Sequence, residues 1–143
     1  GTTEAGYAMG KSHPNSVKTE EWNGTNWSEG PDINAGSAGR RSDAGGCAPN
    51  TMYIIGGNGS NGQPYFTTFD GSSFTAEPNM PNVYHYGRNG HSGNASSALA
   101  WGSSCYKNYS DCTISWDGSS WTEIADMNTA RRQVSVNAPS LNM

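Results

Sequence analysis

The sequence predicts an all-β fold made of three four-stranded antiparallel repeats of 47 residues. The segment WNGTNW at 22–27 returns as FDGSSF at 69–74 and as WDGSSW at 116–121. The chain has 19 glycines, 33% hydrophobic and 10% aromatic residues, and its short apolar runs are flanked by glycine rather than spaced as on a helix. Only 14% of the residues are charged, which argues against a disordered chain.

The repeat interval is the same at every matching position, with no insertion. It separates a glycine, the aromatic residues on both sides of it, and an apolar residue that follows. In an all-β composition, a period of this length predicts β-propeller blades of four strands each. The positions that define the interval are Gly24, Gly71 and Gly118, with Ile33, Met80 and Met127.

The middle repeat shows the expected order of strands. Its first strand is expected over 40–49 and its second over the apolar run at 51–57. A loop then leads to a third strand over 65–70, a tight turn, and a fourth strand over 74–78.

The same template divides residues 1–143, a single repeat domain, into three blades and a remainder. The blades are expected at about 5–33, 40–80 and 88–127. The first blade begins at the position of a second strand, so it lacks a first strand of its own. Residues 131–139 read as a first strand with no blade after it.

These motifs resemble the kelch repeat. MYIIGG at 52–57 matches its apolar strand that ends in two glycines, and WDGSSWTEIADMNTARR at 116–132 matches its tryptophan, methionine and arginine positions. The sequence is also similar to repeat arrays of phage and bacterial surface proteins. The resemblance implies a kelch-like propeller that acts as a non-enzymatic structural or binding module, located extracellularly, on a cell surface or on a virion.

Three blades are too few to close a propeller ring, which usually needs four to eight. We therefore expect the spare strand at 131–139 to complete the first blade of another copy, which gives a homo-oligomer by strand exchange, as a closed ring or a fibre. The alternative is that further repeats of a longer chain supply the missing strands.

The repeated hexapeptide is interpreted as a hairpin turn. Asn-Gly and Asp-Gly tolerate the positive φ that such turns need, and the aromatic residues can face each other across the strand pair. The rival interpretation is an Asp-box, the turn motif of sialidase-like propellers. The expected turn residues are Trp22, Asn23, Gly24 and Trp27; Phe69, Asp70, Gly71 and Phe74; and Trp116, Asp117, Gly118 and Trp121.

A ligand is expected at the opposite end of the blades, where the loops differ between repeats. YHYGRNGH at 84–91 supplies aromatic and basic groups of the kind that dominate binding sites for a glycan or a protein partner. The alternative is that its tyrosines only pack between blades. The ligand-binding candidates are Tyr84, His85, Tyr86, Arg88, Tyr106 and Tyr109.

Two cysteines flank the segment YKNYSD in the expected loop of the third repeat, at 103–112. A disulfide between Cys105 and Cys112 would close this loop and would indicate an oxidising location. The alternative is two free thiols in a reducing compartment.

Several classes of function are not indicated. The net charge is −4 and the eight basic residues are scattered, so nucleic acid is not an expected partner. No run is long and apolar enough to span a membrane. No metal, cofactor or catalytic grouping is expected. The alternatives kept are a fragment of a secreted carbohydrate-active propeller enzyme and an intracellular kelch adaptor.

Overall fold

The computed structural model is an all-β protein with three antiparallel sheets. The structure describes residues 3–9, 17–33, 42–46, 49–56, 64–81, 90–105 and 108–131. Within these ranges, the helical segment is a single 3-10 turn, η1 (Pro49–Thr51). No helix in them is long and apolar enough to cross a membrane.

The first sheet has three strands, in the order β1 (Gly6–Met9), β2 (Thr19–Trp22) and β3 (Trp27–Glu29). Gly6 pairs with Trp22, and Trp22 pairs with Trp27 across the second hairpin. In the described part of the chain β1 pairs with β2 alone, so one edge of β1 is open there.

The second sheet is a four-stranded meander. Its strands lie inside the ranges predicted from the middle repeat, and each is shorter than predicted. They are β4 (Ser42–Gly45), β5 (Tyr53–Gly56), β6 (Phe66–Phe69) and β7 (Phe74–Glu77).

The third sheet is also a four-stranded meander, formed by β8 (Gly90–Asn94), β9 (Ser97–Cys105), β10 (Asn108–Trp116) and β11 (Trp121–Ile124). The prediction of a loop over 103–112 was wrong. β9 and β10 have nine residues each and continue pairing to Cys105 and Asn108, with a register shift between Ser110 and Thr113.

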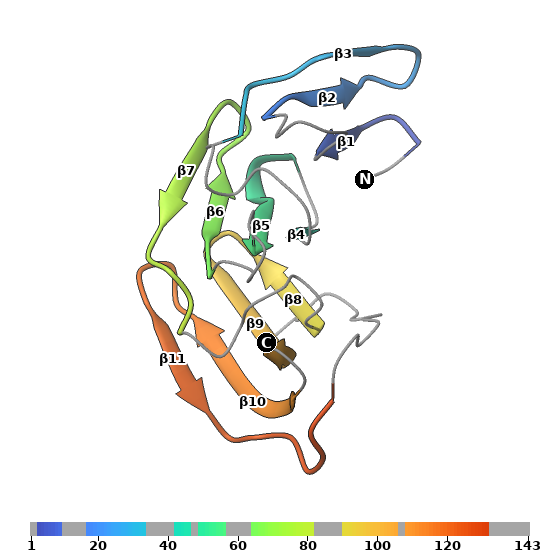
Figure 1. Ribbon diagram of the computed structural model, residues 1–143. Helices are drawn as coiled ribbons and strands as arrows, with labels where there is room; N and C mark the ends of the chain where they lie inside the picture. The colour runs from blue at the N-terminus through green and yellow to red at the C-terminus, as the bar shows by residue number, and fades with distance from the viewer. Residues whose placement is uncertain are drawn as a thin grey trace.

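The three sheets lie side by side along an arc, with β4 and β8 on its concave side and β3, β7 and β11 on its convex side (Figure 1). The middle sheet is thus covered on both faces. All four residues of β5 are buried for this reason, although alternate side chains of a strand point to opposite faces.

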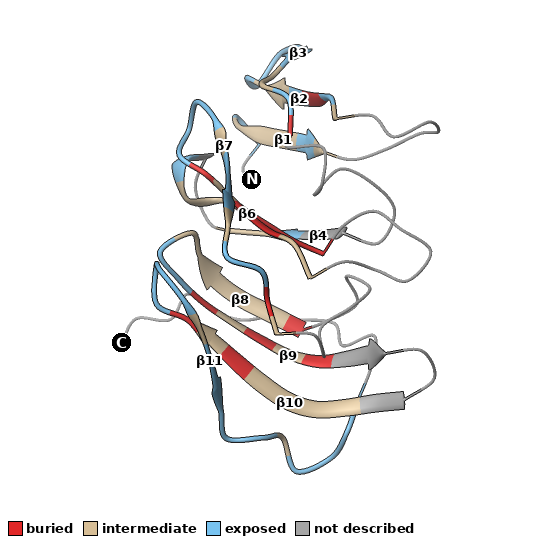
Figure 2. Ribbon diagram, turned by 60° about the vertical axis from the view of Figure 1, so that its left-hand side comes forward, coloured by how far each residue is buried: buried red, intermediate tan, exposed pale blue. Residues whose placement is uncertain are grey.

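The main core lies between the second and third sheets. Figure 2 shows buried residues along β6, β9 and β10, whereas β3 and β11 are mostly exposed. The buried residues of this cluster are Tyr53, Ile55, Phe66, Met80, Ala98, Ala100, Ile114 and Trp116.

A second contact joins the first and second sheets. The rings of Tyr7 and Phe69 meet edge to face with centroids 5.3 Å apart. Ile54 and Thr67 are paired neighbours on β5 and β6 and share a face with Phe69, and all three are buried.

One backbone hydrogen bond recurs in all three repeats with the 47-residue interval. The N–H of the apolar residue that follows the last strand of each sheet donates to a backbone carbonyl near the preceding strand. The acceptor lies two residues before β2 and β6, and within β10. The distances are 2.7 Å for Ile33 to Val17, 2.8 Å for Met80 to Pro64 and 2.8 Å for Met127 to Asp111. At these apolar positions of the repeat, the chain is therefore hydrogen-bonded to its own sheet.

Candidate functional site

Each hexapeptide forms the turn of a hairpin whose two aromatic residues are directly paired. The ring centroids are 5.4 Å apart for Trp22 and Trp27, 4.5 Å for Phe69 and Phe74, and 5.4 Å for Trp116 and Trp121. The glycines at the tips have φ of 94°, 100° and 94°, in the region that favours glycine.

The side chain of the Asn or Asp closes each turn. Oδ1 of Asp70 accepts the backbone N–H groups of Ser72 and Ser73, each at 2.8 Å. Asp117 accepts from Ser119 and Ser120 at the same distances. Asn23 does so with its amide oxygen, from Thr25 and Asn26 at 2.9 Å.

These donors stabilise the ionised carboxylates. The backbone N–H groups of Ser73 and Ser72 lower the pKa of Asp70 to about 2. For Asp117, the backbone N–H of Ser120 and the hydroxyl of Ser119 lower the pKa to about 2. Both carboxylates accept hydrogen bonds from the backbone and hydroxyl groups of their own turns, which is a structural role.

The hexapeptide turns pack against the turns that precede the second strands. A Cβ on Gly118 would lie 3.1 Å from the carbonyl oxygen of Ser96, and one on Gly71 would lie 3.2 Å from Cβ of Asn50. The indole N–H of Trp116 donates to the carbonyl of Ala95 at 2.9 Å, and that of Trp22 donates to Thr3 at 3.0 Å. Both sets of turns therefore lie together at one end of the sheets.

The outward face of the first sheet is the face that does not contact the second sheet. Strand alternation and pairing place Ala8, Glu20, Trp22, Trp27 and Glu29 on it, because Tyr7 on the other face contacts Phe69. Ala8 and Glu20 are exposed, and Trp27 has 52% of its surface exposed.

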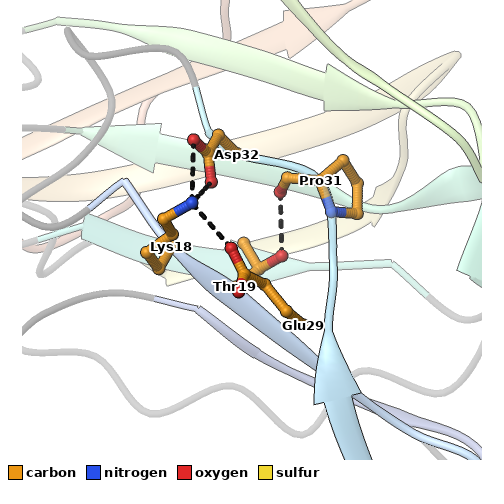
Figure 3. Close-up of polar contacts among 5 residues, drawn as sticks. All are labelled: Lys18, Thr19, Glu29, Pro31 and Asp32. Atoms are coloured by element: carbon orange, nitrogen blue, oxygen red, sulfur yellow. Dashed lines mark hydrogen bonds and ion pairs between the residues drawn. The ribbon is translucent and has the colours of Figure 1, made fainter.

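An ion-pair cluster lies beside these residues (Figure 3). The ammonium of Lys18 is 2.6 Å from Oε1 of Glu29 and 3.0 Å from Oδ1 of Asp32. Hydrogen bonds to Glu29 and then to Asp32 raise the pKa of Lys18, so the ammonium stays charged. Below the cluster, the hydroxyl of Thr19 donates to the carbonyl of Pro31 at 2.8 Å.

The third sheet has a counterpart of this cluster two repeat lengths along the chain. Cys112, Glu123 and Asp126 occupy the positions of Lys18, Glu29 and Asp32, and one ligand atom from each lies within 4.8 Å of the others. A thiolate and two carboxylates are groups that bind divalent cations. In the first sheet the same two carboxylates are satisfied by an ammonium group, so the shared requirement is for positive charge.

A tyrosine and a histidine meet between the second and third sheets. The hydroxyl of Tyr53 and Nδ1 of His91 share a hydrogen bond of 3.0 Å, and their ring centroids are 5.7 Å apart. A side chain at Gly45 would collide with both. Burial lowers the pKa of His91, so the imidazole is neutral at neutral pH.

Most of the predicted ligand-binding residues lie outside the described residues: Tyr84, His85, Tyr86, Arg88 and Tyr106. Tyr109 lies in β10 and pairs with Ser104, so it belongs to a strand and not to a loop as predicted. Its side chain is outside the described part.

The predicted bridge between Cys105 and Cys112 is not present, because Cys112 is a free cysteine. The pairing gives the reason. Cys105 pairs with Asn108 and Ser103 with Ser110, so Cys112 lies opposite the neighbourhood of Trp101 and Gly102. Three residues along a strand separate the two cysteines by about 10 Å, and a disulfide needs Cα atoms within about 7 Å.

The sequence reasoning missed the Lys18 cluster, its counterpart at Cys112 and the pair of Tyr53 and His91. Aligning whole repeats at the 47-residue interval, beyond the hexapeptide, would have placed Cys112 at the position of Lys18. No sequence signal identifies the contact of Tyr53 with His91, because it joins two different sheets.

The fold and these clusters define an all-β repeat protein whose sheets are held by recurrent turn contacts. No protein-family model matches the chain, and no curated protein matches it.

Proposed function

We propose that this chain is a non-enzymatic structural and binding module made of kelch-like propeller blades. It assembles with other copies into a closed propeller or a fibre. The observation that carries the proposal is the difference between the sheets: the second and third begin with an inner strand, β4 or β8, and the first begins with β1, whose outer edge is open in the described part of the chain.

An open edge strand accepts a further strand by backbone pairing. Residues 131–139 are the segment that we propose for this role in another copy. Only Arg131 of this segment is described, and its N–H donates to the carbonyl of Ser110 at 2.9 Å. The segment thus leaves the third sheet beside β10, and its remaining residues are outside the described part.

Light scattering over a range of concentrations tests this assembly. The wild-type chain should have a mass well above the 15.2 kDa of one copy. A variant that ends at Arg131 should be monomeric, with an unchanged far-UV circular dichroism spectrum. A wild-type chain that stays monomeric at all concentrations would rule out strand exchange.

We place the ligand-binding surface at the end of the sheets opposite the hexapeptide turns. The packing of Gly71 on Asn50 and of Gly118 on Ser96 supports this, because it occupies the other end with turns that pack on each other. Loops on a regular scaffold are a common place for binding groups. Tyr84, Tyr86 and Tyr106 would stack on a glycan or an apolar part of a protein partner.

A glycan array tests this surface. Combined substitution of Tyr84, Tyr86 and Tyr106 with alanine should abolish any glycan binding of the wild type without unfolding the chain. Thr75→Ala, on the exposed strand β7, is the matched control and should bind as the wild type does. Binding that survives the triple substitution would refute the placement.

The extracellular, cell-surface or virion location rests on the resemblance to surface repeat arrays. The free thiol of Cys112 removes the argument from a disulfide and is compatible with a reducing compartment. An intracellular kelch adaptor is therefore the second candidate. Thiol titration of the protein unfolded without reductant separates the two, because three reactive thiols favour the adaptor and one favours secretion.

A further inference from the structure

The paired aromatic residues of the hairpins are covered in two sheets and open in the first. In the third sheet, Phe66 of the second sheet covers Trp116 and Trp121 edge to face, with ring centroids 4.9 Å away in both cases. In the second sheet, Tyr7 of the first sheet covers Phe69. Each pair is thus covered by the sheet that comes before it in the chain.

The pair on the first sheet has no such cover in the described part of the chain. Trp116 is 2% exposed, whereas Trp22 at the same position of the first sheet is half-buried. Trp121 is half-buried, whereas Trp27 at the same position has 52% of its surface exposed. A half-open pair of tryptophans is a large apolar surface of the kind found at interaction sites.

The outward face of the third sheet is the face that does not contact the second sheet. It lies at the other end of the row of three sheets. Pairing and alternation place Leu99, Trp101, Thr113 and Ile124 on it, opposite the face that packs on the second sheet. Ile124 has 42% of its surface exposed. By strand pairing, Leu99 stands where Tyr7 and Tyr53 cover the next sheet. Thr113 stands one repeat after Phe66.

The charged groups on the outward face of the first sheet are compatible with the outward face of the third sheet. Lys18 is neutralised by Glu29 and Asp32 within the chain. Glu20 stands where the third sheet has the buried Ile114, and a covered carboxylate needs a hydrogen-bond donor. The outward face of the third sheet carries two hydrogen-bond donors, the indole N–H of Trp101 and the hydroxyl of Thr113.

We propose that the outward face of the first sheet docks on the outward face of the third sheet of a second copy, so that the contact between neighbouring sheets continues from one chain to the next. This inference rests on the proposed function, since it gives the assembly its faces. The contact is head to tail, because the two faces are different; such a contact closes into a ring or extends as a fibre.

Complementation between two variants tests the proposal. Trp27→Lys blocks only the first-sheet face, and Ile124→Lys blocks only the third-sheet face. Each variant alone should be monomeric by light scattering. An equimolar mixture should form a heterodimer of twice the 15.2 kDa monomer mass and nothing larger, because one intact face of each kind remains.

Thr75→Lys is the matched control, since it adds the same charge at an exposed site of the middle sheet and should assemble as the wild type does. Circular dichroism checks that all three variants are folded. If the mixture stays monomeric, or if either single variant assembles as the wild type does, the docking proposal is wrong.

The variant that ends at Arg131 separates this proposal from strand exchange. Assembly that survives the truncation and is lost in Trp27→Lys supports docking without exchange. Assembly that survives both lysine variants and is lost on truncation supports exchange and overturns docking. A wild-type monomer at every concentration overturns both.

Discussion

A short polar side chain that accepts two backbone N–H groups is the most repeated device of this protein. Asn23, Asp70 and Asp117 do this in the hexapeptide turns, and Asn94 does it in the hairpin of β8 and β9, from Ser96 at 2.9 Å and Ser97 at 3.0 Å. Amide and carboxylate oxygens serve equally in these turns, since both accept hydrogen bonds. Charge is therefore an added property of two of the four turns.

This added charge predicts a loss of stability in acid. Asp70 and Asp117 have a pKa of about 2 when folded and near 3.8 when unfolded. Between these values the unfolded chain binds more protons, so stability should fall as the pH falls from about 4 to 2. Urea denaturation at several pH values measures this. In the double variant Asp70→Asn with Asp117→Asn, the free energy of unfolding should depend less on pH. A pH dependence equal to that of the wild type would contradict the prediction.

His91 predicts a second dependence at higher pH. Its pKa is lowered from 6.5 by burial, so the unfolded chain binds more protons as the pH falls below about 6.5. The free energy of unfolding should therefore be lower at pH 5 than at pH 7.5. His91→Gln keeps a hydrogen-bonding group next to Tyr53 and should remove the difference. Denaturation curves at both pH values check this, and a variant that keeps the full difference would assign the effect to another group.

The hairpin is the element that the repeat preserves. Its turn needs a positive φ at one position, its aromatic residues pair across the strands, and its tip packs on a neighbouring turn. The first tryptophan of a hairpin also donates to the carbonyl of Thr3 or Ala95, which joins two turns of the same sheet. The middle sheet has Phe69 at this place, and the ring of Tyr7 packs against it instead.

Two glycines on such elements should respond differently to alanine. Gly118→Ala should lower the free energy of unfolding by about 1–3 kcal/mol, because φ is +94° and Ser96 is close. Gly6→Ala is the control, since its Cβ would meet Trp22 at an ordinary 3.8 Å. Thermal and urea unfolding compare the two variants. Equal effects would mean that the turn geometry is not what requires glycine at 118.

At the scale of the whole molecule, stability depends on contacts between sheets. No sheet buries both of its faces alone, and the middle sheet does so only because it lies between the other two. Neighbouring sheets are also joined by a backbone hydrogen bond of 2.9 Å, from Ala95 in the turn after β8 to Thr51 in the turn before β5. This dependence on neighbours is typical of repeat proteins.

Phe66 should therefore be among the most sensitive positions. It is 1% exposed and contacts Tyr53, Trp116 and Trp121. Phe66→Ala should cost about 3–5 kcal/mol of stability, from lost burial and the cavity that remains. Ile124→Ala, at an exposed apolar site, should change stability by no more than about 0.5 kcal/mol. Urea denaturation of both variants measures the contrast, and a similar loss in both would place the core elsewhere.

Local signals in the sequence predicted the strands and turns well. Alternation of side chains, the Gly-containing turn motif and aromatic residues separated by four others located β5, β6 and β7 within a few residues. The same signals failed at 103–112, where polar residues and two cysteines suggested a loop. There β9 and β10 continue to pair with each other beyond the last residues paired with β8 and β11, which composition does not reveal.

The sequence by itself determined the repeat interval, the strand order within each repeat and the turn at every hexapeptide, because these depend on residues close together in the chain. Only the tertiary structure decided which aromatic pairs are covered, that Cys112 is free, and that His91 meets Tyr53. Those facts depend on the packing of one sheet on another. Such packing joins residues far apart in the sequence, and no local pattern encodes their distance.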